Sequence, residues 1–218
     1  MKGRTLFAVL GSLFLAGQAM SQEKPQDKDK AGAKPAAKTA DAKGQAPAGG
    51  PSAEDMAKMM ELATPGQEHA AMKPLVGNWT CDVSVTMTPG APPDKSSGTM
   101  RREMILDGRY LSENYEGTWG EMPFKGHGLM GYDRAQNQYQ AIWIDTMSTG
   151  MWHQIGKGDS AGKKITFEGE NFDCMEGKKK WGKSTIEITS NDKHTMKMFT
   201  KGPDGKEFQN FEMTCTRK

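Results

Sequence analysis

Apolar and polar residues alternate along the chain from Gly77 onward. Trp79, Cys81, Val83 and Val85 take every second position in the first such run, and polar residues stand between them. Because successive side chains of a strand point to opposite faces, this run predicts a strand with one buried face. Similar runs recur about every ten residues to the end of the chain, which is typical of an all-β domain.

Turn-forming residues separate these runs from one another. The further strands that the alternation predicts are 97–106, 109–119, 124–133, 138–146, 150–158, 164–173, 181–190, 194–201 and 206–217. Short connections containing Asp, Asn and Gly join them, so neighbouring strands should pair antiparallel. A meander exposes two edges unless its first and last strands pair. The sequence therefore predicts an antiparallel meander closed into a β-barrel of about ten strands.

A helical period precedes the strands. Ser52 has the hydroxyl of a helix N-cap, and three methionines and Leu62 then follow at the spacing of one helical face. Residues 64–67, Thr-Pro-Gly-Gln, end this helix and begin a second one, with Thr as N-cap and Pro in the first turn. Pro74 ends the second helix. Two short helices are thus expected before the barrel.

The first residues of the chain have the features of a signal peptide. Lys2 and Arg4 are basic, residues 6–16 form an apolar run, and Ala19 and Ser21 have the spacing that a signal peptidase recognises. The apolar run is about half as long as the roughly 20 residues of a membrane-spanning helix. We therefore expect residues 1–21 to be removed on export and to leave no integral membrane segment.

Residues 22–51 contain neither aromatic nor branched aliphatic side chains and are rich in Ala, Lys, Pro and Gly. Such a segment buries too little apolar surface to offset its ordering entropy, so it is expected to be a disordered linker. The organisation expected is a signal peptide, this linker, and one domain over residues 52–218. The protein is expected in the periplasm, the cell envelope or the extracellular space.

The charges of the chain exclude one class of partner. Lys and Arg number 29 and Asp and Glu number 27, for a net charge of +2. Nucleic-acid binding needs a concentrated positive surface, because counterion release from phosphates drives it. The basic run of Lys178, Lys179 and Lys180 with Lys183 is interpreted instead as a solvated hairpin loop. No nucleic-acid partner is expected.

A register argument concerns the two ends of the barrel. In an antiparallel pair, opposed residue numbers have a constant sum, and Trp79 with Arg217 has the same sum as Cys81 with Cys215. One register would therefore stack a guanidinium on an indole and bring two thiols to disulfide distance. In an oxidising compartment Cys81 and Cys215 would then form a disulfide, and Cys174 would stay outside it. Three cysteines allow other pairings, so the sequence leaves the connectivity open.

Sequence landmarks resemble a known family. Gly77-Asn78-Trp79 at the start of the first strand, with Arg217 in the last, resembles the lipocalin-like (calycin) plan, in which a Gly-x-Trp lies at the closed end beneath an Arg. Residues 74–79, 131–133, 143–150 and 202–207 together resemble the bacterial domain-of-unknown-function family 1579. The resemblance covers about residues 56–218. It implies a bacterial source and a lipocalin-like β-barrel, and it brings no established activity or catalytic residue.

Catalytic signatures are absent from the sequence. It has no Gly-x-Ser-x-Gly, His-Glu-x-x-His or Cys-x-x-Cys motif, and its histidines have no close metal-ligand partner in sequence. No catalytic residue, metal site or cofactor is therefore assigned, and the sequence favours a non-enzymatic protein.

Aromatic residues give the functional hypothesis. Strand faces that mix aromatic, Met and a few polar side chains suit a barrel that holds a small apolar or amphipathic ligand. The residues predicted to line or rim this site are Tyr110, Trp119, Tyr139, Trp143, Asp145 and His153. The alternative is a barrel filled by its own side chains. Which face of each strand points inward stays open, because a one-residue register shift reverses it.

Other functions remain open on particular residues. A hydrolase or isomerase would use Asp145, His153 or Glu103 as acid or base. Haem or nitric-oxide binding would need His153 or His194 as axial ligand. Cu(I) binding would combine His153 with the thioethers of two nearby methionines, Met147 and Met151. A structural module tethered by its lysine-rich tail is the last alternative.

Overall fold

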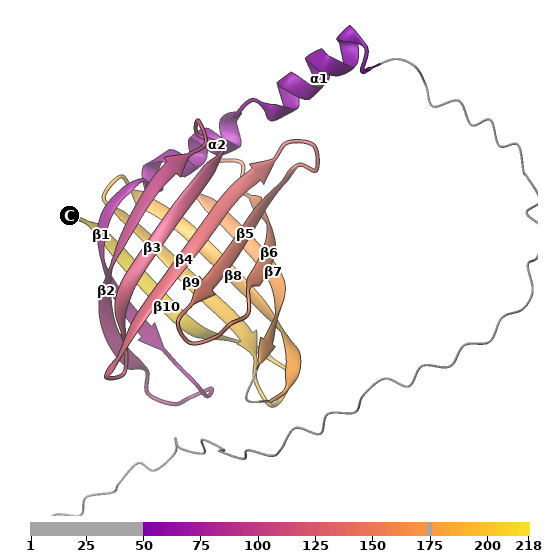
Figure 1. Cartoon of the computed structure of the whole chain (residues 1–218). Helices are drawn as coiled ribbons and strands as arrows, with labels where there is room; N and C mark the ends of the chain where they lie inside the picture. The colour runs from indigo at the N-terminus through magenta and orange to yellow at the C-terminus, as the bar shows by residue number, and fades with distance from the viewer. Residues whose placement is uncertain (1–49, 174–175) are drawn as a thin grey trace, which may run out of the picture. The chain divides into compact units, whose positions relative to one another are not determined.

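The computed structural model describes residues 50–173 and 176–218. In this part of the chain ten strands form a closed barrel, in which each strand pairs antiparallel with its neighbours in sequence and the first pairs with the last (Figure 1). The strands are β1 (Gly77–Val85), β2 (Asp94–Ile105), β3 (Tyr110–Trp119), β4 (Met122–Asp133), β5 (Gln138–Asp145), β6 (Trp152–Gly158), β7 (Lys164–Asp173), β8 (Lys178–Ser190), β9 (Lys193–Lys201) and β10 (Glu207–Arg217). The predicted fold class is confirmed.

β8 begins three residues earlier than the alternation predicted. β8 starts at Lys178, so the basic run lies in a strand, and its interpretation as a hairpin loop was wrong. The reason is ion pairing across the β7–β8 pair. Lys179 Nζ lies 3.3 Å from Glu170 Oε2, and Lys180 Nζ lies 2.7 Å from Asp173 Oδ2. Cross-strand charge pairs thus continue the ladder beyond its apolar part.

The first and last strands have the register that the number sum indicated. Trp79 lies opposite Arg217 and Cys81 lies opposite Cys215. The two cysteines form a disulfide that joins residues 134 positions apart. The barrel is therefore closed at this seam both by backbone hydrogen bonds and by a covalent bond.

Arg217 ties three segments together at one end of the barrel. Its guanidinium carbon lies 4.2 Å from the centroid of the Trp79 ring. Its nitrogens donate to the carbonyl oxygens of Val76 at 2.7 Å, Pro74 at 2.9 Å and Asn191 at 2.6 Å. A planar group with five N–H donors suits both contacts, because it can stack and donate at once.

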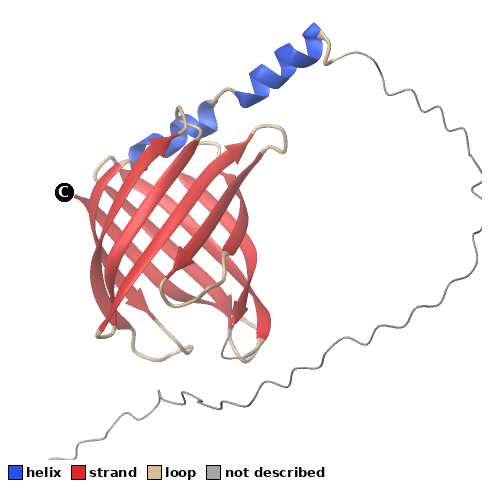
Figure 2. Ribbon diagram, in the orientation of Figure 1, coloured by secondary structure: helices blue, strands red, loops and turns tan. Residues whose placement is uncertain are grey.

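Two elements before β1, α2 (Gln67–Met72) and the 3-10 turn η1 (Lys73–Leu75), cover the same end of the barrel (Figure 2). The preceding helix α1 (Ala53–Ala63) has no buried residue and extends away from the barrel. Met72 and Leu75 are fully buried among the side chains of the barrel. Tyr139 Oη donates to the carbonyl oxygen of Glu68 at 3.1 Å. α2 and η1 thus close this end with apolar contacts and with hydrogen bonds from Tyr139, Trp79 and Arg217.

The starts of the two helices differ in how well the sequence predicted them. Ser52 is the N-cap of α1, and its hydroxyl accepts from Asp55 N at 3.1 Å, as expected. The second helix begins at Gln67, after Gly66, so the expected Thr-Pro start was wrong. The His69 ring explains the later start, because its Nδ1 accepts from Gly66 N at 3.0 Å.

Several expectations concern residues outside the described ones. The signal peptide and nearly all of the linker lie in residues 1–49, and Cys174 lies in the 174–175 gap. These expectations therefore stay predictions. No helix within residues 50–173 and 176–218 is long and apolar enough to cross a membrane.

Candidate functional site

The strand register fixes which side chains face the interior of the barrel. Trp79 pairs with Met100 on one side and with Arg217 on the other, and side chains at paired positions share a face. Carried around the barrel, the same rule gives one inward set. Near α2 this set is packed solid, because Leu111 and Phe167 are almost fully buried against the side chains that α2 and η1 insert.

A charged network lies on the inner face beside Trp79. Arg102 Nε donates to Glu113 Oε2 at 2.7 Å, and Arg102 Nη1 donates to His194 Nε2. The side chain of Arg102 has no exposed surface. The His194 ring meets Trp79 edge-on, with 4.4 Å between ring centroids. The buried guanidinium is therefore compensated by a carboxylate and by a neutral imidazole.

His194 should make the stability of the fold sensitive to acid. Burial first, and then the charges of Arg102 and Arg217, lower the pKa of His194 from 6.5 to about 3. Between these two pKa values, His194 is protonated in the unfolded chain and neutral in the folded barrel. Stability should fall by about 1.4 kcal/mol per pH unit as the pH drops from about 6.5 towards about 3, and should be unaffected by this group above that window.

Denaturant unfolding at a series of pH values measures this slope. The variant His194→Gln lacks this titrating group. The pH dependence of its unfolding free energy between those limits should therefore be smaller than that of the wild type, by the uptake of one proton per molecule. His153→Gln is the matched control, because the His153 ring is exposed to solvent on the outer face. Equal slopes for wild type and His194→Gln would contradict the assignment.

Large inward side chains lie against the barrel wall, because glycines on nearby strands leave room for them. A Cβ atom built on Gly126 would lie 2.0 Å from the Trp143 ring, and one on Gly128 would lie 2.4 Å from Glu113 Oε1. Across the barrel, a Cβ on Gly182 would lie 3.2 Å from the ring of Trp152. These side chains therefore cover bare backbone and do not cross the interior.

Space remains inside the barrel as a result. Glu113 faces inward from the middle of β3, away from both ends of the strand, and its side chain is still 18% exposed. Met196, Met198 and Phe211 also face inward and are only partly buried. Because these side chains face inward, their exposed surface faces open space inside the barrel. The half of the barrel away from α2 is thus not filled by its own side chains.

Hydrogen bonds hold several polar groups of this inner wall in position. Trp143 Nε1 donates to Asp145 Oδ2 at 2.9 Å. Ser184 Oγ donates to Gln154 Oε1 at 3.2 Å, and both residues are buried. Apolar surface with a few oriented polar anchors is the usual composition of a small-molecule site.

The mouth of the barrel, at the end opposite α2, carries exposed apolar side chains. The connections β1–β2, β3–β4, β5–β6 and β7–β8 all lie at this end (Figure 1). The exposed apolar residues at or next to them are Met87, Trp119, Met122, Met147, Met151 and Phe172. An apolar rim of this kind suits the entry of an apolar or amphipathic molecule.

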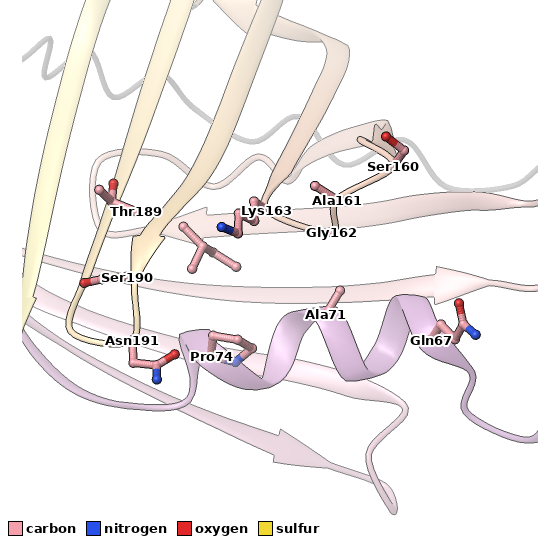
Figure 3. Close-up of a pocket in the computed structure, with 11 residues that line it drawn as sticks. Gln67, Ala71, Pro74, Ser160, Ala161, Gly162, Lys163, Thr189, Ser190 and Asn191 are labelled. Carbon is pink, nitrogen blue, oxygen red and sulfur yellow. The ribbon is translucent and has the colours of Figure 1, made fainter.

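A groove of about 500 Å³ lies on the outside, at the helical end. Figure 3 shows α2, with Ala71 and Gln67, along one side of it and the β6–β7 turn, with Gly162 and Lys163, along the other. Loop backbone and small side chains form most of its lining, and Lys163 is its one charged lining residue among those described. The barrel interior, with its buried polar anchors, is therefore the better candidate site.

Residues 64–217 match the family described as "Protein of unknown function (DUF1579)". The chain belongs to the DUF1579 family. No curated protein matches it in sequence.

The DUF1579 barrel is similar to solved structures. Rv2717c from M. tuberculosis aligns with a TM-score of 0.54 and 11% identity, over 71% of this chain and 99% of that one. The S-type phycobiliprotein lyase CPES from Guillardia theta aligns with a TM-score of 0.47 and 11% identity, over 71% of this chain and 98% of that one. At this identity the first likeness shows the fold alone, and the second carries no argument.

Four of the predicted site residues lie on the inner surface or at the mouth of this DUF1579 barrel. Trp143 and Asp145 face inward in the unfilled half. Tyr139 also faces inward, but it is buried in the packed end near Glu68. Trp119 lies at the mouth and is 41% exposed.

Two predicted site residues point the other way. Tyr110 pairs with Gly131 on the outer face, and His153 pairs with Ile142 on the outer face. These two side chains therefore do not line the interior, and a place for them at the rim of the site stays a prediction. Inward positions of β3 and β6 are one residue away from those chosen, at Leu111 and Gln154, and a shift of one residue reverses the face.

Sequence reasoning missed the charged pair of the inner wall. Arg102 stands between Met100 and Met104, and Glu113 stands between Leu111 and Tyr115, at positions where the alternation expects apolar residues. Opposite charges at apolar positions of two consecutive strands are the signal that identifies such a pair.

The enzymatic and cofactor alternatives find no assembled site. Asp145 faces inward, whereas His153 and Glu103 lie on the outer face, so the barrel wall separates these candidate acids and bases. Glu103 pairs with Arg101, and His194 is occupied by Arg102. Within the described residues no cluster of three or more His, Cys, Asp or Glu side chains could hold a metal ion.

Proposed function

We propose that the protein binds a small amphipathic molecule inside its barrel, without catalysing a reaction. The observation that carries this proposal is the partial exposure of Glu113, an inward-facing residue in the middle of a strand. Space at that position lies between the filled helical end and the apolar mouth. An elongated molecule could therefore place a polar group at mid-depth and an apolar part towards the rim.

The inner wall supports an amphipathic occupant. Met196, Met198 and Phe211 supply flexible and aromatic apolar surface on β9 and β10. On the opposite side Trp143 lies flat over Gly126. Methionine adapts its shape to varied partners, and an indole offers a large rigid face. The polar groups on the same wall, Asp145 and Gln154, would orient the ligand.

Filling the interior should abolish binding. Met198→Trp adds volume on the inner face of β9, and we expect it to reduce binding of the fluorescent probe anilinonaphthalene sulfonate by at least about tenfold, measured by fluorescence titration. Lys197→Trp is the matched control, because the adjacent Lys197 lies on the outer face and makes only an exposed pair with Glu212. This control should bind the probe as the wild type does.

Thr200→Trp, nearer the mouth on the same inner face, is a second blocking variant in case Met198→Trp does not fold. Circular dichroism checks the fold of each variant. Native mass spectrometry of the protein purified from its own host would show the natural occupant. Equal probe binding by folded inner-face and outer-face variants would place the probe elsewhere and defeat the proposal.

A further inference from the structure

Among the residues that the structure describes, the buried polar atoms that lack a partner inside the barrel are all hydrogen-bond donors. Within the described residues, the buried side-chain nitrogens and oxygens that have no hydrogen-bond partner are Arg102 Nη2, Trp152 Nε1, Gln154 Nε2, His194 Nδ1 and Asn210 Oδ1. All except Asn210 Oδ1 belong to side chains on inward-facing strand positions. Buried polar atoms usually have partners, so a group of four requires an explanation.

All four of these inward atoms are donors. An arginine nitrogen, an indole nitrogen and an amide nitrogen can only donate. His194 is a donor by elimination. Since Arg102 Nη1 can only donate, His194 Nε2 accepts from it, and the proton of the neutral ring is on Nδ1. The interior therefore has a surplus of donors.

Three acceptor side chains on the same wall already accept hydrogen bonds from protein donors. Glu113 accepts from Arg102, and Asp145 accepts from Trp143 Nε1 and from the Met147 amide. Gln154 Oε1 accepts from Ser184. A ligand group that can only donate, such as an ammonium, could share one of these acceptors but would leave the four donors without a partner. A ligand oxygen would complete donors that lack a partner.

Two of the donors lie next to each other on one strand. Trp152 and Gln154 are alternate residues of β6 and so share its inner face. The Trp152 ring lies over Gly182, and the Gln154 side chain lies over Gly169, where a Cβ would come within 3.3 Å of its Cγ. Ser184 holds the amide by its oxygen, which leaves the amide nitrogen as the unpartnered donor. Gln154 is 7% exposed, so this donor lies deep inside the barrel.

We infer that the ligand of this barrel presents an oxygen acceptor, a carboxylate or an uncharged carbonyl, to Trp152 Nε1 and Gln154 Nε2. This inference rests on the proposed ligand-binding function and names the chemical class of the ligand. The polar group binds at β6, and the apolar part of the molecule extends along Met198 and Phe211 towards the mouth. Cationic amphiphiles are disfavoured, because an ammonium cannot accept hydrogen bonds from these donors.

A series of probes with one chain length and three head groups tests the head-group class. Dodecanoate carries a charged acceptor, methyl dodecanoate an uncharged acceptor, and dodecylamine a cationic donor. Displacement of anilinonaphthalene sulfonate should show dodecanoate or its methyl ester binding at least about tenfold more tightly than the amine, because two hydrogen bonds distinguish them. The comparison of acid with ester tells whether charge or the carbonyl alone is recognised.

Two substitutions locate the contact. Trp152→Phe removes one donor and keeps the ring, so it should weaken binding of the acceptor probe about fivefold and leave the amine unchanged. Gln154→Glu exchanges the donor for acceptor oxygens and should reverse the preference towards the amine. Trp181→Phe is the control, since Trp181 lies on the outer face with its Nε1 directed at Glu168.

The outcomes separate the two proposals. If none of the probes, the fluorescent one included, binds the wild-type barrel, the proposed function fails. If all three aliphatic probes bind with similar affinity, and Trp152→Phe matches Trp181→Phe, the barrel binds ligands but the acceptor assignment is wrong, and ordered water completes the donors. Trp152→Phe keeps this test decisive even if Gln154→Glu does not fold.

Discussion

Replacing both cysteines of the seam, Cys81→Ala with Cys215→Ala, is expected to lower the free energy of unfolding by about 4–5 kcal/mol. The disulfide joins residues 134 positions apart, so it removes the entropy of a very long loop from the unfolded chain. It also holds the pair of strands, β1 and β10, whose contact is the most distant in sequence. Guanidinium unfolding followed by circular dichroism measures the change.

A Cys174→Ser background keeps the third thiol out of exchange reactions in this experiment. Reduction of the disulfide in that background should reproduce the loss seen in the alanine variants. A loss below about 1 kcal/mol would mean that the β1–β10 hydrogen bonds and the Arg217–Trp79 contact close the barrel without covalent help.

Arg102→Met is expected to destabilise the barrel by about 3–5 kcal/mol, the usual cost of breaking a buried ion pair. The substitution keeps an apolar stem of similar length but leaves Glu113 and His194 without the guanidinium that both contact. Arg101→Met is the matched control on the same strand. Arg101 points outward and pairs with Glu103 in solvent, so its loss should cost less than about 1 kcal/mol.

A double variant distinguishes broken pairing from lost packing. Arg102→Met with Glu113→Leu removes both charges, and the double variant should recover much of the stability that Arg102→Met alone loses, because an apolar pair can replace a buried ion pair. Urea unfolding of the four proteins measures these differences. Equal costs for Arg102→Met and Arg101→Met would show that the inner network contributes no more than a surface pair.

Two inward-facing glycines, Gly126 and Gly182, connect the fold to the proposed function. Trp143 and Trp152 are large enough to fill the interior, yet Trp143 lies over Gly126 of the neighbouring strand β4, and Trp152 lies over Gly182 of β8, two strands away. Adding a side chain at Gly126 or Gly182 would push these rings inward. Glycine is entropically costly to order in a strand, but these glycines leave room inside the barrel for the proposed ligand.

The closure of the barrel followed from the sequence because the signals were strong and local. Alternation from Trp79 to Val85 and its repeats located the strands, and Asp–Gly and Asn-containing turns separated them. The Trp79–Arg217 register followed from arithmetic once the two end strands were assumed to pair. The start of α2 was harder to predict, since the His69 ring contact that accompanies it depends on packing.

The candidate site was less predictable, for a geometric reason. Alternation shows that a strand has two different faces, but where both faces carry aromatic and polar residues it does not show which one is inside. Tyr110 and His153 were placed inside on that ground, while Glu113 and Gln154 were missed. Only the closed register, which links every strand to a neighbour of known orientation, decides the question.

The sequence by itself located most of the strands and their antiparallel order, because these depend on local periodicity and short turns, and it offered one register for the seam if the two end strands pair. The tertiary structure decided which side chains face the interior and how much of it they fill. Whether Trp152 crosses the interior or lies over Gly182, and whether Gln154 keeps a free donor, depends on side chains contributed by strands distant in sequence. Such contacts have no signature in the order of residues along one strand.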